Sequence, residues 1–205
     1  MRSPFRDFLL GAVFVGILVG AVLMARQMRP KTPAPETNPS RSKGPPDAPV
    51  RIIEYSDFQC PACAKAQTAL NELFQRFDGK IQLVYQHFPL SSHTWSGLAH
   101  QSAECAALQN HFWSYHDRLY ADQKVWSTSP EAPLEIFLHY AGEEGLDLES
   151  FSHCLADPKV TAKIREERLT GEGLGVRSTP SFFVNGEMVI GTEPLGKKIE
   201  KHIGP

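Results

Sequence analysis

Residues 50–63 read Val50-Arg-Ile-Ile-Glu-Tyr-Ser-Asp-Phe-Gln-Cys60-Pro-Ala-Cys63. The first six residues form a short apolar run, rich in β-branched side chains, which fits a largely buried strand. From Pro61 to Phe77 the apolar residues recur at helical spacing, and Asp78-Gly79 supplies a stop signal. The stretch therefore predicts a strand that leads directly into a helix, with a Cys-x-x-Cys pair at the junction.

Further strands are expected on both sides of a long central region. One runs from Ile81 to Phe88, and its order after the first strand and helix implies a right-handed parallel crossover. Near the C-terminus, residues 181–184 and 187–190 predict two more strands. Asn185-Gly186 between them is a strong hairpin signal.

The region between these strands is predicted to be helical. Apolar residues at helical spacing indicate helices at 95–108, 111–120, 134–140 and 148–155, and a charge-rich, surface-facing helix at 158–169. Asn110 and Asp147 are expected to cap helices here. With a last helix at about 194–203, the order is β-α-β, several helices, then β-β-α.

Cys60 lies where the first strand meets the first helix. Backbone N–H groups at a helix start lack intrahelical partners and the helix dipole is positive there, so a thiolate is stabilised. Its pKa is expected to fall from about 8.5 towards 3.5–7.5. Pro61 suits the first helical position because its missing N–H would have no partner anyway. Cys63 lies on the same face and can close a small disulfide as the less exposed, resolving thiol.

Three other interpretations of this pair are a structural disulfide, half of a zinc site and a chance spacing. Zinc usually takes four ligands, and Cys105 and Cys154 stand alone and far apart, so a four-cysteine zinc cluster is not expected. The histidines between His87 and His153 are scattered and are interpreted as neutral core or surface residues. A Cys-x-x-Cys in a β-α unit favours redox chemistry.

Five short motifs, each present once, are spread along the chain. They are Glu54-Tyr-Ser-Asp-Phe-Gln-Cys60-Pro-Ala-Cys63, His87-Phe-Pro-Leu90, Ala103-Glu-Cys105-Ala, Phe112-Trp-Ser-Tyr-His116-Asp and Gly175-Val-Arg-Ser-Thr179-Pro180-Ser-Phe-Phe-Val-Asn185-Gly186. Together they resemble the DsbA-like thioredoxin-fold proteins over essentially all of residues 50–205. The resemblance is closest to the membrane-anchored branch of thiol-disulfide oxidoreductases that includes BdbD-type proteins. It implies a thioredoxin core interrupted by a helical subdomain.

The resemblance also implies roles for three more residues. Pro180 would be a cis-proline that faces the redox-active pair Cys60 and Cys63 and presents the Thr179 backbone to an extended substrate. Glu54 would be the family's buried acid beneath the active site, able to exchange a proton with Cys63. The alternatives are an ordinary turn proline and a glutamate at the strand end that reaches solvent.

The dipeptide between the cysteines departs from the strongly oxidising DsbA enzymes, which carry Pro-His where this chain has Pro61-Ala62. Without an imidazole near Cys60, stabilisation of the thiolate is expected to rest on backbone dipoles alone. Reduction potentials of thiol-disulfide enzymes range from about −120 to −270 mV. The sequence leaves the position within that range open.

Cys105 and Cys154 lie in predicted helices of the region that the resemblance covers. Each could be a small buried apolar residue, the usual state of a free cysteine. The even number of cysteines favours pairing, and we expect a structural disulfide between these two. Such a bond would place the domain outside the cytoplasm.

The charge balance bears on the function of the whole chain. Its 205 residues include 21 basic and 23 acidic side chains, a formal net charge of −2. This balance gives no electrostatic support for a nucleic-acid-binding protein, which needs a basic excess. The composition also excludes a wholly disordered chain, a collagen and a multi-span membrane protein.

Residues 8–25 read FLLGAVFVGILVGAVLMA, without a charged or strongly polar side chain. Because about 20 such residues cross a bilayer, residues 1–29 are predicted to be an uncleaved N-terminal membrane anchor. A cleaved signal peptide and a buried core helix are the alternatives. Two arginines precede the span and three basic residues follow it, so the positive-inside count does not support an outside C-terminus.

Residues 30–49 contain seven of the 16 prolines and are predicted to be a semi-rigid linker. The folded domain is expected at 50–205, with a helical insertion at about 91–170. With the element order and the fold that the resemblance implies, the expected fold class is α/β: a thioredoxin fold with an inserted helical subdomain, preceded by one transmembrane helix.

These features predict an extracytoplasmic thiol-disulfide oxidoreductase with a single pass through the bacterial cytoplasmic (inner) membrane. It would introduce disulfides into unfolded or partly folded secreted proteins through Cys60 and Cys63, without a cofactor or a metal. As the resemblance implies, a quinone-linked membrane partner would re-oxidise the pair. The alternatives are a disulfide reductase or isomerase that uses the same site, and a non-catalytic metal-binding module. The sequence leaves substrates, redox partner, oligomeric state and direction open.

Overall fold

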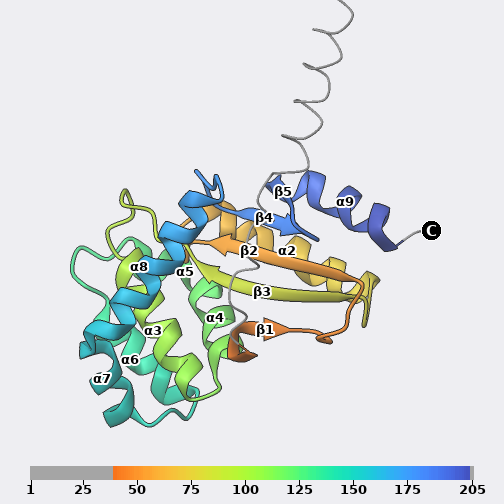
Figure 1. The fold of residues 1–205 in the computed structure, drawn as a ribbon. Coiled ribbons are helices and arrows are strands. Elements are labelled where there is room, and N and C mark those ends of the chain that lie inside the picture. Colours follow the sequence, from red (N-terminus) through yellow and green to blue (C-terminus); the bar gives the residue numbers. More distant parts are fainter. Residues whose placement is uncertain (1–38, 204–205) are drawn as a thin grey trace, which may run out of the picture. The chain divides into compact units, whose positions relative to one another are not determined.

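A five-stranded sheet is the centre of the fold in the computed structural model, which describes residues 39–203 (Figure 1). Its order is β1-β3-β2-β4-β5. β2 and β3 are parallel, and the other neighbouring pairs are antiparallel. The predicted β-α-β unit and C-terminal hairpin are confirmed. The strands are β1 (Ser42–Lys43), β2 (Val50–Ser56), β3 (Ile81–His87), β4 (Ser181–Val184) and β5 (Glu187–Ile190).

Helices cover both faces of the sheet and extend beyond one end of it (Figure 1). α2 (Pro61–Arg76) and α9 (Glu193–Ile203) share one buried cluster with the sheet, to which they contribute Leu70 and Leu195. α8 (Pro158–Gly173) packs on the opposite face. The remaining helical elements are η1 (Pro39–Arg41), α3 (Ser96–Leu108), α4 (Phe112–Ala121), α5 (Gln123–Ser127), α6 (Leu134–Glu143) and α7 (Leu148–Ala156). All predicted helices are present, and α5 was not predicted.

Local sequence signals explain several of these boundaries. The Asp147 carboxylate accepts a hydrogen bond from the Ser150 N–H at 2.7 Å and so caps α7. Asn185 and Gly186 have φ values of 48° and 87°, as the tight hairpin turn requires. Asn110, with φ of 65°, caps the end of α3, where its N–H and the next one bond to carbonyls of the last turn.

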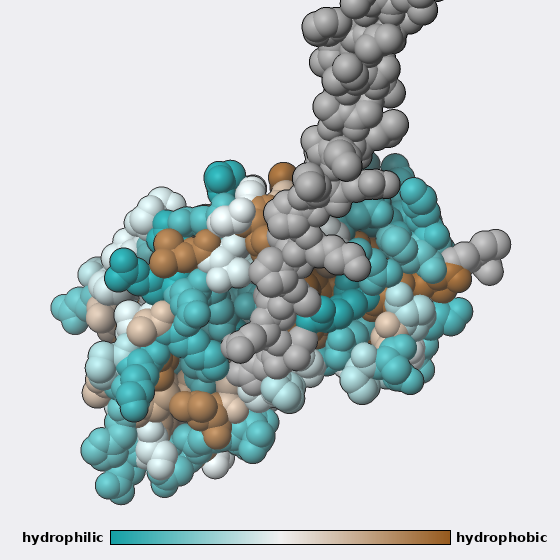
Figure 2. Space-filling view, in the orientation of Figure 1, coloured by the Kyte–Doolittle hydropathy of each residue, from teal (hydrophilic) through white to brown (hydrophobic). Residues whose placement is uncertain are grey.

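The largest buried cluster joins the inserted helices to the active-site end of the sheet. It includes Phe58, Cys60 and Cys63 together with Phe112 and Trp126 from the insertion. The face shown in Figure 2 is mostly hydrophilic, with apolar side chains in separate small patches. Through this cluster the insertion packs against the turn that carries Cys60 and Cys63, which we call the reactive turn, and so it is not an appended module.

The folded part of the chain begins upstream of the boundary predicted at residue 50. Ser42–Lys43 pairs with the edge of β3, and the Trp113 indole N–H donates to the Ser42 carbonyl at 3.2 Å. Arg41 is only 1% exposed. The proline content of residues 30–49 concealed this, because a two-residue strand has no periodicity and a single buried arginine looks like linker charge.

The predicted membrane anchor at residues 1–29 lies outside the described residues. Between residues 39 and 203, no helix combines the length and the apolar character needed to cross a membrane. The anchor and the first part of the linker therefore stay predictions from the sequence.

Candidate active site

Cys60 and Cys63 lie at the start of α2, directly after the loop that follows β2. Cys60 occupies the N-cap position, with extended φ and ψ of −76° and 120°, and Pro61 is the first helical residue. Both thiols are free. Cys60 is 7% exposed and Cys63 is 0% exposed. Cys60 is therefore the more accessible thiol, as expected, although the observed difference in exposure between the two thiols is small.

The two thiols differ strongly in acidity. The hydrogen bond from the Cys63 thiol, with smaller contributions from Thr179 and two backbone N–H groups, lowers the pKa of Cys60 to about 5 against the opposing effect of burial. Burial, and then the Cys60 sulfur, raises the pKa of Cys63 well above its usual value. At neutral pH Cys60 is a thiolate and Cys63 keeps its proton. The expectation that backbone dipoles alone stabilise the thiolate is wrong, because the Cys63 thiol contributes most.

Thr179 and Pro180 face this pair from the loop that precedes β4. The Thr179–Pro180 peptide bond is cis. The Thr179 carbonyl oxygen lies 3.5 Å from Cys60 Sγ. An extended peptide that ran along this loop would pass beside the reactive sulfur.

Glu54 lies on the central strand β2 and is completely buried. Burial raises its pKa to about 7, although Ser56 and Gln67 oppose the shift. Gln67 Nε2 donates to Glu54 Oε1 at 3.1 Å, whereas Glu54 Oε2 has no hydrogen-bond partner among the described residues. The alternative in which Glu54 reaches solvent is therefore excluded. Near neutral pH its carboxyl group can both give and take a proton.

Two buried hydroxyl groups that the sequence analysis did not single out lie beside these groups. Ser56 interacts with both the Glu54 carboxyl and the Cys63 thiol. Its Oγ lies 2.9 Å from the hydroxyl oxygen of Tyr120 on α4. Alternation along β2 puts Ser56 on the same face as Glu54, a signal that could have identified it. No sequence spacing connects Tyr120 to the site.

Asp57 ties the neighbouring loops to the cysteines. Its fully buried carboxylate accepts hydrogen bonds from the Leu90 N–H at 2.7 Å and the Ser96 hydroxyl at 2.8 Å, and lies 2.8 Å from His93 Nδ1. The Asp57 N–H points to Cys63 Sγ at 3.5 Å. One side chain thus fixes the loop after β3 and the start of α3 around the reactive turn.

Two glutamines connect the turn that carries Cys60 with the insertion: Gln123 lies on the insertion and Gln59 lies in the turn. Gln123 Nε2 on α5 donates to the carbonyl oxygens of Phe58 and Cys60 at 2.7 and 2.9 Å. Gln59 Oε1 accepts from the Trp95 N–H at 2.7 Å. The unpredicted helix α5 is therefore part of the active-site support.

Three histidines that are scattered in the sequence come together around Phe58. His87 Nδ1 lies 2.6 Å from His100 Nδ1, and the Phe58 ring contacts the rings of His100 and His116. Burial lowers the pKa of all three, that of His87 to about 3, so they are neutral. Within residues 39–203, no group of three or more histidine, cysteine, aspartate and glutamate residues is arranged to hold a metal ion.

A buried charge network lies next to these histidines. The Arg41 guanidinium pairs with Glu167 through both terminal nitrogens, one of them at 2.8 Å, and Arg41 Nε lies 3.3 Å from Glu104 Oε2. Lys163 pairs with the other oxygen of Glu104. The helix predicted to face the surface is mostly exposed, but its Glu167 is largely buried and its partly exposed Lys163 reaches Glu104, so both balance charges from distant segments.

Cys105 on α3 and Cys154 on α7 form a disulfide, with their Cα atoms 5.7 Å apart. The bond joins two helices of the insertion across a sequence separation of 49 residues. It involves neither Cys60 nor Cys63, which are both free.

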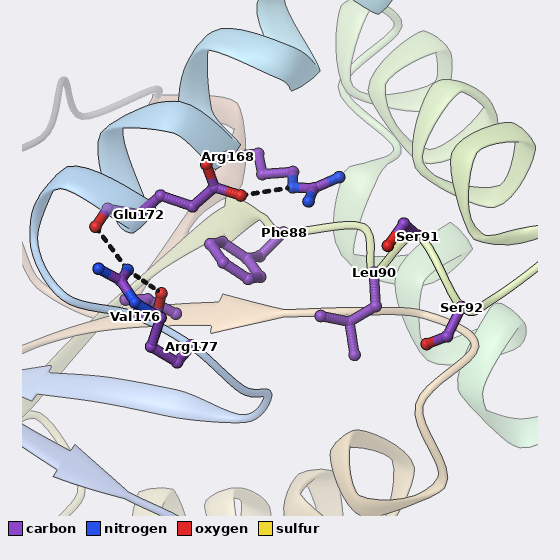
Figure 3. A pocket seen from close by; sticks show the side chains of 8 residues that line it. All are labelled: Phe88, Leu90, Ser91, Ser92, Arg168, Glu172, Val176 and Arg177. Carbon is purple, nitrogen blue, oxygen red and sulfur yellow. Dashed lines mark hydrogen bonds and ion pairs between the residues drawn. The ribbon is translucent and has the colours of Figure 1, made fainter.

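A cavity of about 450 Å³ lies between α8 and the loop after β3; we call it the α8 cavity (Figure 3). Arg168 and Glu172 of α8 are ion-paired at 3.0 Å, and Arg177 donates to the Glu172 carbonyl at 2.7 Å. Because Arg177 precedes Thr179 by two residues, the cavity adjoins the loop that faces Cys60. Its lining residues are Phe88, Leu90, Ser91, Ser92, Arg168, Glu172, Val176 and Arg177.

Comparisons with known proteins agree with this architecture. The sequence model of the family described as Thioredoxin matches residues 36–201. A thioredoxin-like oxidoreductase from Silicibacter pomeroyi DSS-3 has a TM-score of 0.67 and 28% identity, over 80% of this chain and 92% of that one.

Two DsbA-like structures share the fold at lower identity. The alpha-DsbA1 of Wolbachia pipientis has a TM-score of 0.71 and 22% identity, over 83% of this chain and 92% of that one. Oxidised BdbD of Bacillus subtilis has a TM-score of 0.69 and 19% identity, over 80% and 92%. At these identities the likeness shows the fold alone.

Curated relatives extend well beyond the matched region. The Na(+)/H(+) antiporter NhaA 3 of Salinispora tropica is 37% identical over 145 residues, and NhaA 1 of Salinispora arenicola is 39% identical over 145 residues. Each match covers 70% of this chain but 21% of the relative. This chain therefore spans about a fifth of the length of these relatives.

Proposed function

Because this chain belongs to the thioredoxin family and has the fold of DsbA-like thiol-disulfide oxidoreductases, we propose that it introduces disulfides into unfolded or partly folded proteins. The observation that carries this proposal is the pairing of a Cys60 thiolate with a protonated Cys63, opposite the Thr179–Pro180 loop. A pair in which only one thiol is ionised has a defined nucleophile and a defined resolving group.

The proposed reaction begins with the Cys60–Cys63 disulfide. A substrate thiolate attacks Cys60 Sγ, the disulfide breaks, and Cys63 leaves as a thiolate that takes up a proton. A second substrate thiolate then attacks the substrate sulfur of the mixed disulfide, which forms the substrate disulfide and releases Cys60 as a thiolate. Two electrons pass from the substrate to the cysteine pair, and the chemistry requires no further cofactor.

The low pKa of Cys60 supports the oxidase direction. A stabilised thiolate stabilises the reduced protein relative to its disulfide, and this makes the disulfide a stronger oxidant. To work repeatedly, the reduced pair must pass two electrons to an acceptor, which we propose to be a quinone-linked membrane partner. The same residues would run in reverse in a reductase or isomerase.

We place this activity outside the cytoplasm, at the cytoplasmic (inner) membrane. The proposal is supported by the disulfide between Cys105 and Cys154, because structural disulfides persist in oxidising compartments. The apolar run at 8–25 would anchor the chain with a single pass. Ion transport is not part of the proposal, because the match covers only 21% of the antiporter relatives.

The α8 cavity is the proposed place for a side chain of the substrate, because Arg177 in its lining belongs to the segment that leads into the Thr179–Pro180 loop. Leu90 adds apolar character to its lining, and Arg177 adds positive charge beside the Arg168–Glu172 ion pair. A protein substrate bound along the Thr179–Pro180 loop would reach this cavity within a few residues of its cysteine.

Trapping of mixed disulfides tests the roles of the two cysteines. Cys63→Ser should accumulate substrate proteins linked to Cys60, because the resolving thiol is missing. Cys60→Ser should trap none and should have no activity. Trapping by the second variant and not the first would reverse the assignment. Stoichiometric metal in the purified protein, without disulfide exchange, would support the metal-binding alternative instead.

A further inference from the structure

Ser56 influences the pKa of both groups that must exchange a proton in the proposed reaction. Its side chain is fully buried and interacts with both the Glu54 carboxyl and the Cys63 thiol. With each partner it favours the deprotonated form, as a hydroxyl group does when it donates a hydrogen bond. The free oxygen of Glu54, Oε2, has no hydrogen-bond partner among the described residues and is available to accept this hydrogen bond.

Tyr120 restricts how the Ser56 hydroxyl can be oriented. The two hydroxyl oxygens lie 2.9 Å apart, and either could be the donor. Carboxylates and thiolates only accept hydrogen bonds. The arrangement that serves all the groups has Tyr120 donating to Ser56 Oγ, which leaves the Ser56 hydrogen free to point at Glu54 or Cys63.

The other titratable groups around Glu54 cannot take the place of its carboxyl. Tyr85 on β3 and Tyr120 on α4 interact electrostatically with Glu54, and Cys63 on α2 and Asp57 after β2 interact with one or both of these tyrosines. Burial raises the pKa of Tyr85 and Tyr120 well above their usual value, so both keep their protons. The Asp57 carboxylate already accepts hydrogen bonds from the surrounding loops. Glu54 is the buried acid that is left to exchange a proton.

We propose that the Ser56 hydroxyl relays the proton between Glu54 and Cys63, and that Tyr120 is the positioning residue that orients this hydroxyl. When Cys63 Sγ leaves with the electron pair of the broken disulfide, Ser56 gives its proton to that sulfur and receives one from Glu54. The net change is the transfer of one proton from Glu54 to Cys63. The steps reverse when Cys63 attacks to close the disulfide.

This inference rests on the proposed function, because the proton moves only when the disulfide opens or closes. It gives the inserted helices a part in the chemistry, since Tyr120 comes from α4. An aromatic disulfide made of two nitrobenzoate thiols separates the two steps. Attack by Cys60 releases the first coloured thiolate, and attack by Cys63 on the mixed disulfide releases the second.

Rapid mixing of the reduced full-length protein with this disulfide measures both releases on one sample. In Ser56→Ala the second release should slow by about tenfold or more, while the first release stays unchanged. Ser56→Thr keeps the hydroxyl and should restore the second rate. Tyr120→Phe should slow the second release by a smaller factor.

The matched control is Tyr115→Phe, which removes another buried hydroxyl from α4. The Tyr115 hydroxyl donates to the Phe137 carbonyl at 2.8 Å, whereas the Tyr120 hydroxyl pairs with Ser56. Both rates should stay at the wild-type value in this variant. In the wild type, the second rate should rise with pH through about 7, where Glu54 loses its proton, and Ser56→Ala should lose this dependence.

Four results would overturn the relay. An unchanged second release in Ser56→Ala would show that Glu54 acts without this hydroxyl. Equal slowing of both releases, or equal slowing in Tyr115→Phe, would reduce the role of these hydroxyls to packing. A wild-type protein that shows no second release would overturn the proposed function itself, and the relay with it.

Discussion

Two residues of the active site, Cys60 and Glu54, have pKa values that are shifted in opposite directions. Cys60 is surrounded by donors, and its pKa falls to about 5. Ser56 and Gln67 favour the ionised form of Glu54, but burial outweighs them and raises its pKa to about 7. The site therefore holds a stable thiolate beside a carboxyl group that is still partly protonated at neutral pH.

The raised pKa of Glu54 predicts a pH-dependent effect on stability. The folded protein binds this proton more tightly than the unfolded chain, whose glutamate titrates near 4.5. Stability from this group is therefore complete below about pH 4.5 and is lost as the pH rises through about 7. Relative to the wild type, Glu54→Gln should therefore increase the free energy of unfolding more at pH 8 than at pH 5, by up to roughly 3 kcal/mol.

Chemical denaturation at pH 5 and pH 8 measures this difference. Glu72→Gln is the control, because Glu72 is an exposed glutamate on α2. Relative to the wild type, the control should change the free energy of unfolding by the same amount at both pH values. If Glu54→Gln behaves in the same way, the carboxyl group is ionised in the folded protein at pH 5 and the assignment of its pKa is wrong.

The residue between Pro61 and Cys63 predicts how oxidising the pair is. Ala62→His would add an imidazole near Cys60, as in the Pro-His enzymes that the sequence resembles. The pKa of Cys60 should fall further, by roughly one unit, and the disulfide should become more oxidising. Thiolate absorbance and equilibration with glutathione measure the two effects. Thr68→His, on the exposed side of α2, should change neither.

At the scale of elements, α8 approaches the sheet at a glycine. A Cβ atom at Gly171 would lie 2.8 Å from Tyr55 Cε1 and 3.0 Å from Phe88 Cδ2. Both rings are buried and belong to one cluster with Val176. The absence of a side chain at Gly171 thus allows α8 to lie against the sheet and to form one wall of the α8 cavity.

Gly171→Ala should lower the free energy of unfolding by about 1–3 kcal/mol, because a methyl group would overpack this contact. Gly173→Ala is the matched control on the same helix, since nothing lies within 4 Å of its Cβ position. The control should be neutral or slightly stabilising, because alanine favours a helix over glycine. Equal stability of both variants would show that α8 can shift away from Tyr55 without cost.

The elements that could be predicted from the sequence are those with a periodic pattern or a turn signal. β2, α2 and the hairpin at Asn185-Gly186 belong to this group. α5 has five residues and β1 has two, which is too short for any period to appear. α8 is mostly exposed, as predicted, but its Glu167 pairs with Arg41, 126 residues away, and no sequence spacing indicates this contact.

At the scale of the whole molecule, the site residues with a local sequence signal could be predicted, and those that depend on distant contacts could not. Cys60, Cys63 and Pro180 were identified because they belong to short motifs, and Glu54 because it lies at a fixed distance before Cys60. Their supporting residues come from the insertion, in contacts that span about 60 residues of sequence, such as those of Tyr120 with Ser56 and Gln123 with Cys60. A single sequence has no spacing rule for contacts of this length.

The insertion is held together by the Cys105–Cys154 disulfide, and its removal should affect the whole molecule. Replacing both cysteines with alanine should lower the stability by about 2–4 kcal/mol and reduce the melting temperature. Disulfide exchange through Cys60 and Cys63 should be largely retained. Thermal unfolding and an exchange assay measure the two properties. An unchanged melting temperature would show that the bond does not stabilise the fold.

The buried Arg41 also has a mechanical consequence. If residues 1–29 hold the chain at a membrane, tension along the linker reaches the domain at Arg41 and β1 before it reaches Val50. β1 is an edge strand, and Arg41 is held there by ion pairs with Glu104 and Glu167. A pull on the tether is therefore borne by the rim of the sheet, and the central strand that carries the reactive turn stays free of load until that rim detaches.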